Sequence, residues 1–425
     1  MATFDEWLAL APQPQKLTDN QRWHIFLSYR SVHRPWVVQL YDILRHLNFE
    51  VFLDQYVLAA SDTLVGGLAE GLEKSAAGVL IWSAATQDSV WCKKECDSME
   101  ARATSDQGFH YVVTTLDRVD LPHWAQQRIY IDFADFREGP RGTGLLKLLY
   151  GIAGKPLPAP AVRLATEVDE EVRKALMSIT GALNTGDVQR LLDLSMTETL
   201  AWITSPLLGC NTVDALIKLK RYDEAVKLLI SLRTRFPKAI RTQQLHGLVL
   251  ARMGEWRAAQ AILSDLEAAG EQDPETLGIY ARTWMDRYQE SKMINHLRRS
   301  RDLYARAFQN APHDYYTGIN AASKSVFLNE IPAATDYANK VETIVGTKKV
   351  DQDYWKTATV AEVQLIKQNY RNAAELYEAA VTMEPESLGS HESTWLQARR
   401  LMDVLKPSGD DRALVSKAFA HLPVP

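Results

Sequence analysis

The chain of 425 residues has little of what marks secreted, membrane-spanning or metal-binding proteins. Its three cysteines, Cys92, Cys96 and Cys210, are too few for a disulfide framework, and no histidine near them completes a zinc site. We interpret them as free thiols of a cytoplasmic protein. No apolar run approaches the roughly 18 residues that span a bilayer, and the acidic N-terminal segment does not look like a secretory signal.

Strong charge of one sign is also absent. The net charge is −5 and the pI is near 6.1, so nucleic acid is unsupported as a partner, though not excluded. The sequence contains no G-x-S-x-G, H-E-x-x-H or EF-hand motif. The segment GGLAEG (66–71) lacks the Lys-Ser/Thr ending of a phosphate-binding loop and falls in a helix-like stretch. These absences leave a soluble globular protein, long enough for two or three domains.

Apolar runs and helical patterns alternate between residues 21 and 155. The runs that predict buried strands are 23–27, 51–53, 78–82, 110–116 and 128–132. The stretch after Pro35 has apolar residues at helical spacing, and similar helical stretches separate the other runs. This alternation predicts a five-stranded parallel sheet covered by helices on both faces, which is an α/β fold.

Three short segments stand where such strands end. They are HIFLSYRS (24–31), EVFLDQ (50–55) and SVWCKKE (89–95). The carboxyl ends of parallel strands gather at one edge of the sheet, where ligands bind. Glu95 lies one helical turn beyond Trp91, so its carboxylate and the indole are expected on one helix face.

These segments, in this order, resemble the Toll/interleukin-1 receptor (TIR) domain. FLSYRS matches the box that ends the first strand, and FLDQ with VLAASDTL matches the second strand and its loop. IWSAATQDSVWCKKE matches the third strand and the W-x-x-x-E element of the next helix. The resemblance covers about 130 residues and implies a flavodoxin-like fold. Family members often have glycine where this chain has Ser61.

Many TIR domains cleave the bond between nicotinamide and ribose in NAD+. The resemblance therefore implies that Glu95 is catalytic and stabilises the positive charge that develops on the ribose. It implies further that substrate is bound by a set of residues from the three segments and the loop between them: Tyr29, Arg30, Ser31, Ser61, Leu64 and Trp91. NAD+ would be the substrate, with no cofactor and no metal.

Several residues of the matched segments also have structural interpretations. Trp91 could be a core anchor, and Arg30 is as well explained by an ion pair as by a ligand. Asp54 is expected to fix the loop after the second strand, and Ser83 to be a turn residue.

The second half of the chain is predicted to be all helical. A proline-rich segment, 156–165, is expected to be a linker, followed by a helical pair at 166–210. KRYDEAVKLL and GEWRAAQAIL then align with their aromatic residues at 222 and 256, a period of 34 (256 − 222). That period resembles tetratricopeptide repeats, so residues 211–425 are expected to form a solenoid. Residues 1–20 form an N-terminal extension, and residues 21–155 the TIR domain.

One part of this half is more specific. Residues 273–284 and 297–322 resemble the helical TRAF-binding region of apoptosis-signal-regulating kinases and its bacterial relatives. The resemblance implies a regulatory or protein-binding module rather than an active site.

Two functions fit these observations. The first is a TIR NAD+ glycohydrolase that releases nicotinamide and ADP-ribose, or a cyclic isomer, and is activated by self-association under control of the helical domain. The second is a non-catalytic TIR scaffold that mediates protein–protein assembly. The domain pairing implies a bacterial source and a role in immune defence against phage.

Overall fold

The computed structural model describes residues 9–54, 64–83, 86, 90–117, 121, 130–134, 139–203, 205–237, 239–350 and 352–422. The chain divides into two compact units, Met1–Glu271 and Gln272–Pro425, which are described separately below. Among the described residues, none of the helices is both long and apolar enough to cross a membrane.

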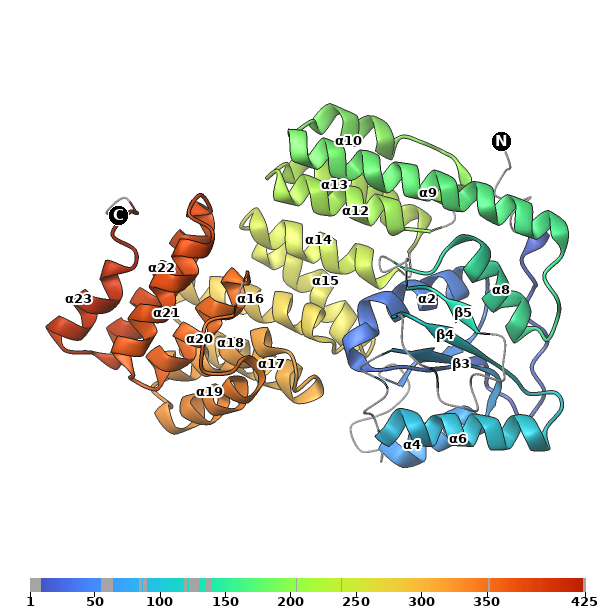
Figure 1. The fold of residues 1–425 in the computed structure, drawn as a ribbon, viewed down its shortest axis with the longest axis horizontal. Coiled ribbons are helices and arrows are strands. Elements are labelled where there is room, and N and C mark those ends of the chain that lie inside the picture. Colours follow the sequence, from blue (N-terminus) through green and yellow to red (C-terminus); the bar gives the residue numbers. More distant parts are fainter. Residues whose placement is uncertain are drawn as a thin grey trace. The chain divides into compact units, whose positions relative to one another are not determined.

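The first unit contains a five-stranded parallel sheet (Figure 1). Its strands are β1 (Trp23–Ser28), β2 (Val51–Phe52), β3 (Ser75–Trp82), β4 (His110–Thr115) and β5 (Ile131–Asp132), in the order β2-β1-β3-β4-β5. Nearly every residue of β1, β3 and β4 is buried, as expected for parallel strands covered on both faces. The predicted sheet is confirmed.

Helices cover both faces of this sheet, and the alternation of side chains along β1 decides which core each residue joins. Ile25 and Leu27 pack on the face covered by α2 (Arg34–His46), which follows the short helix η1 (Ser31–His33), and by α8 (Gly142–Ile152). Phe26 packs on the opposite face with α4 (Leu64–Glu73) and α6 (Val90–Ser105). The position after Phe26 on that face is Ser28, so the end of β1 presents a hydroxyl toward the α6 side.

Further helices follow α8, the last helix that covers the sheet, along the chain. They are α9 (Ala159–Thr185), α10 (Val188–Ser195), α11 (Leu200–Ile203), α12 (Leu207–Lys218), α13 (Tyr222–Arg235), α14 (Ile240–Arg252) and α15 (Trp256–Ala268). One hydrophobic core extends from Ile25 in the sheet to Val249 in α14. The sheet and the first helical repeats therefore share their interior.

The segment 156–165, expected to be a linker, is partly helical instead. Helix α9 begins at Ala159, within 156–165, and carries Pro160 in its first turn. Proline is tolerated there because the first amides of a helix have no partner within the helix. Only the short segment 153–158 connects α8 to α9. The other expected domain limits, at 20, 165 and 210, stay predictions.

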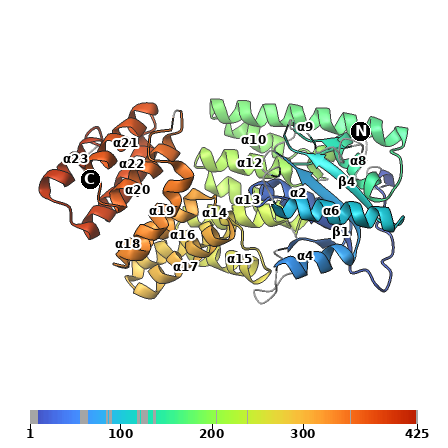
Figure 2. The same cartoon turned by 60° about the horizontal axis from the view of Figure 1, so that its bottom comes forward.

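The second unit is all helical (Figure 2). Its helices are α16 (Pro274–Ser291), α17 (Ile294–Asn310), α18 (Tyr315–Phe327), α19 (Ile331–Val345), α20 (Tyr354–Ile366), α21 (Tyr370–Met383), α22 (Leu388–Leu405) and α23 (Gly409–Lys417). Ala334 in α19 and Ala374 in α21 are buried, and their small side chains let paired helices approach closely. The predicted fold class, an α/β domain followed by an all-helical region of repeats, is confirmed.

The repeats share one turn. The aligned aromatic residues Tyr222 and Trp256 each begin the second helix of a pair, and Ile331 and Tyr370 do the same in later pairs. Two positions before each, the backbone has a positive φ: 58° at Lys220, 83° at Gly254, 59° at Asn329 and 62° at Gln368. Lys292 has the same conformation, with φ 56°, two positions before α17. This left-handed conformation suits glycine and is tolerated by asparagine, but it is unfavourable for lysine.

We therefore expect Lys292→Gly to raise the free energy of unfolding of the second unit by about 0.5–1 kcal/mol, because it removes a left-handed lysine. Asn329→Gly is the matched control, and it should have a smaller effect. Urea unfolding followed by circular dichroism measures both. Destabilisation by Lys292→Gly would contradict the argument.

Candidate active site

Three loops meet at the carboxyl edge of the sheet because β1 pairs in parallel with both β2 and β3. Ser28 is the last residue of β1, Asp54 follows β2 by two residues, and Ser83 directly follows β3. The strand pairing therefore places all three residues at one edge of the sheet.

Glu95 lies on α6 and is turned toward this edge. The Ser28 hydroxyl donates a hydrogen bond to Glu95 Oε2, across 67 positions of sequence. Ser28 is itself buried, with 1% exposure, while Glu95 is half-buried. The structure thus places the Glu95 carboxylate against the end of β1.

Burial raises the pKa of Glu95 from 4.5 to about 7. The hydrogen bond from Ser28 acts in the opposite direction, since it stabilises the ionised carboxylate, and the negative charge of Asp54 raises the pKa further. A carboxyl group poised near neutrality in such a setting is a feature of functional sites.

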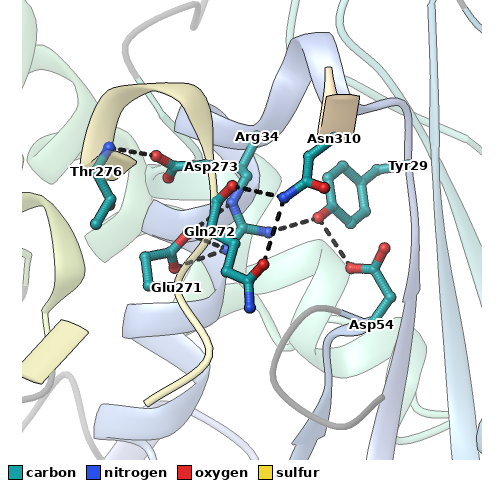
Figure 3. A network of polar contacts seen from close by, with 8 residues as sticks. All are labelled: Tyr29, Arg34, Asp54, Glu271, Gln272, Asp273, Thr276 and Asn310. Carbon is teal, nitrogen blue, oxygen red and sulfur yellow. Dashed lines mark hydrogen bonds and ion pairs between the residues drawn. The ribbon is translucent and has the colours of Figure 1, made fainter. Parts of the chain in front are cut away.

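A second set of contacts continues on the α2 side of the edge (Figure 3). The Tyr29 hydroxyl donates to Asp54 Oδ1 at 3.1 Å and accepts from Arg34 Nη1 at 2.8 Å. Arg34 forms a bidentate ion pair with Glu271, with Nη2 lying 2.5 and 2.6 Å from the two carboxylate oxygens. Desolvation raises the pKa of Tyr29 well above its ordinary value, so its hydroxyl stays protonated and able to donate.

A histidine also reaches the edge. His33 Nε2 lies 2.5 Å from Ser83 Oγ, and Ser83 is also within 3.0 Å of Thr86 Oγ1. Burial lowers the pKa of His33, and the charge of Arg30 adds to this effect, while Asp117 opposes it. The imidazole is therefore neutral at physiological pH. Within the described part of the chain, no three His, Cys, Asp or Glu side chains gather to hold a metal.

The residues expected from the sequence are placed as follows. Glu95 and Tyr29 lie at the sheet edge with the contacts given above, and Asp54 fixes the end of β2 through Tyr29. Arg30 and Ser31 are half-buried between β1 and α2. Ser61 lies outside the described residues. Leu64 begins α4 and Trp91 lies in α6, but their side chains are outside the described part of the structure. The assignment of substrate contacts to these residues stays a prediction.

Four residues of the site were not found from the sequence: Ser28, His33, Arg34 and Glu271. The alternation of β1 could have shown that Ser28, not Tyr29, faces the α6 side. No local signal could have shown Glu271, which lies 237 positions from Arg34.

Comparison with known families agrees with the geometry. Residues 25–148 match the TIR domain, and residues 221–328 match the family described as tetratricopeptide repeats-sensor.

The chain carries a TIR domain followed by tetratricopeptide-sensor repeats.

Glu95 thus lies in the TIR domain, and Glu271 lies within the matched sensor repeats. Both kinds of domain are typical of protein–protein interaction. The similarity of residues 273–284 and 297–322 to a TRAF-binding region stays a prediction.

Among solved structures, the chain is similar to a thermophilic TPR protein of Thermus thermophilus. That match has 14% identity and a TM-score of 0.37, and it covers 47% of this chain and 98% of that one. MamA of Desulfovibrio magneticus matches with 16% identity and a TM-score of 0.33, covering 41% of this chain and 94% of that one. Similarity at this level carries no conclusion about function. A comparison with curated proteins found no match.

The raised pKa of Glu95 predicts a pH-dependent stability difference. The folded TIR domain favours the neutral carboxyl, so wild-type stability should fall as the pH rises from about 4.5 through 7. Glu95→Gln cannot ionise. Its free energy of unfolding should match the wild type near pH 4 and exceed it by up to about 3 kcal/mol at pH 9.

Denaturant unfolding at the two pH values measures this difference. Asp97→Asn, an exposed acid on the same helix, is the control and should change stability little at either pH. An equal effect of Glu95→Gln at pH 4 and pH 9 would show that the carboxyl is not desolvated.

Proposed function

We propose that the TIR domain is a NAD+ glycohydrolase that uses Glu95 as its catalytic carboxylate. The observation that carries the proposal is the position of Glu95: half-buried at the carboxyl edge of the sheet, bonded to the buried Ser28, with its pKa raised to about 7. The order of the three sequence segments and the TIR match support it.

The chemistry asks little of the protein. The nicotinamide of NAD+ is bound through a cationic ring nitrogen and leaves as a neutral molecule, so its departure needs no general acid. Ordinary glycosides differ, since their hydrolysis uses a pair of carboxyl groups. What the reaction needs is a negative charge beside the ribose as positive charge develops there, and an ionised Glu95 can supply it.

Substrate would help to ionise Glu95. A cationic pyridinium within a few ångströms favours the charged carboxylate and lowers its pKa. The free enzyme would therefore hold Glu95 partly protonated near pH 7, and the complex with NAD+ would hold it as the anion. The desolvation that raises the pKa also strengthens the attraction between the carboxylate and the ribose cation.

Control by self-association and by the helical repeats belongs to the same proposal, as do the protein partners that the two domains suggest. The domain pairing also supports a role in bacterial defence through loss of NAD+. Equal protection of infected cells by the wild type and by Glu95→Gln would refute that role.

The central prediction is NAD+ turnover that depends on Glu95. Purified protein, at high concentration and after forced oligomerisation, should release nicotinamide from NAD+, and Glu95→Gln should lower the rate by at least about a hundredfold. Mass analysis of the second product distinguishes ADP-ribose from a cyclic isomer. Asp97→Asn is the control on the same helix, and it should keep the wild-type rate.

Two outcomes would decide against the proposal. Unchanged turnover in Glu95→Gln would remove Glu95 from the mechanism. Clear assembly of the protein without any turnover would favour the alternative, a TIR scaffold that does no chemistry.

The pH profile gives a second prediction. The acid limb of kcat/KM should lie near pH 7 in the wild type, because it reports the free enzyme. Ser28→Ala removes a hydrogen bond that favours the anion, so the limb should move to higher pH, by about one unit. Asp54→Asn removes a nearby negative charge, so the limb should move to lower pH. If the acid limb moved in the same direction in Ser28→Ala and in Asp54→Asn, the assigned contacts would be contradicted.

A further inference from the structure

Helix α2 connects the TIR sheet to the helical repeats of the first unit. It packs against α14, and its residues meet the repeats at three levels. Arg34, at its first turn, pairs with Glu271. Asp42, in its middle, faces the backbone of Ile240 at the start of α14. The ring of His46, at its end, lies 5.8 Å from that of Phe236.

The Arg34–Glu271 ion pair is the most buried of these contacts. Arg34 is 2% exposed and Glu271 is not exposed at all. Three hydrogen bonds join them: two from Nη2 and one from Nε, at 3.1 Å. The fork of the guanidinium therefore takes up both carboxylate oxygens and is fixed in one orientation.

In that orientation the third guanidinium nitrogen of Arg34, Nη1, points toward the candidate site. Nη1 donates to the Tyr29 hydroxyl, which then has its own proton free to donate to Asp54, as Figure 3 shows. Asp54 acts electrostatically on Glu95. A continuous set of hydrogen bonds thus runs from Glu271 through Arg34 and Tyr29 to Asp54, and the charge of Asp54 acts on the proposed catalytic carboxylate of Glu95.

Glu271 does not belong to the TIR domain. It follows α15 inside the matched sensor repeats, and its backbone N–H donates a hydrogen bond to the carbonyl oxygen of Leu266 in that helix, at 2.9 Å. It is also the last residue of the first unit, where the chain passes into the second. The charge that orients Arg34 is therefore supplied by the helical repeats.

We propose that Glu271 is a positioning residue for the TIR active site, by which the tetratricopeptide-sensor repeats hold Arg34, Tyr29 and Asp54 in place beside Glu95. This proposal rests on the glycohydrolase function proposed above. Its consequence is that a conformational change at the end of α15 alters the positions of Arg34, Tyr29 and Asp54. The repeats then affect the site without any direct contact with the substrate.

A double-mutant cycle tests the proposal. Glu271→Gln keeps the size and one acceptor of the side chain but removes its charge, and Tyr29→Phe removes the central link while leaving the ion pair intact. Each should lower kcat on the high-pH plateau by roughly tenfold, with a smaller change in KM. Because both act through one set of contacts, the double variant should lose about tenfold and not a hundredfold.

Glu224→Gln is the matched control, since Glu224 lies on the same repeats and has its own arginine partner, Arg221. It should keep the wild-type kcat. Wild-type kcat in Glu271→Gln, or losses that multiply in the double variant, would overturn the proposal. If Glu271→Gln does not fold, Arg34→Lys replaces it in the cycle, because lysine keeps the charge and loses the fork.

A titration separates this proposal from the proposed function. In protein labelled with 13C at the glutamate carboxyls, the Glu95 signal is identified by its loss in Glu95→Gln. Glu271→Gln and Tyr29→Phe should each move its titration to lower pH, in the direction expected for Asp54→Asn, because Asp54 is released. An unmoved titration would refute the positioning role even in a protein that does not turn over NAD+, whereas a moved titration without turnover would refute only the enzymatic function.

Discussion

The parallel pairing of β1 with β2 on one side and β3 on the other is the constraint on which the candidate site depends. It brings the ends of three strands to one edge, which therefore carries Ser28, Asp54 and Ser83. The helix that follows β3 then returns across the same face as Phe26, and Glu95 meets Ser28 there. The raised pKa of Glu95 follows from this packing, because burial removes the carboxylate from water, while the hydrogen bond from Ser28 opposes the shift.

On the α2 side of the sheet, burial affects an ion pair instead of a single carboxyl group. Sheet and repeats share one hydrophobic core, and the polar groups within that boundary must therefore find partners there. Arg34 and Glu271 satisfy each other almost without exposure. Loss of one partner from such a pair typically destabilises a protein by about 3–5 kcal/mol, whereas the intact pair contributes little net stability. Its value lies in the single orientation that it imposes on Arg34.

Much of the fold could be predicted, because strands and helices depend on local patterns of apolar residues. The five strand positions, the helix after Pro35 and the repeat with aromatic residues at 222 and 256 all follow from such patterns. The expected linker failed for a local reason too: three prolines suggested an extended spacer, yet Pro160 occupies a first helical turn, where proline is accepted.

The sequence by itself placed an acidic residue near the start of the helix after the third strand, and the carboxyl ends of parallel strands gather at one edge, so an acid was expected there. Only the tertiary structure decided which groups meet it. Side chains 28 and 29 leave β1 on opposite faces, so Ser28 contacts Glu95 while Tyr29 turns toward Arg34. The partner of Arg34 comes from 237 positions away, and no local pattern can encode such a pairing, because it depends on how α2 packs against distant repeats.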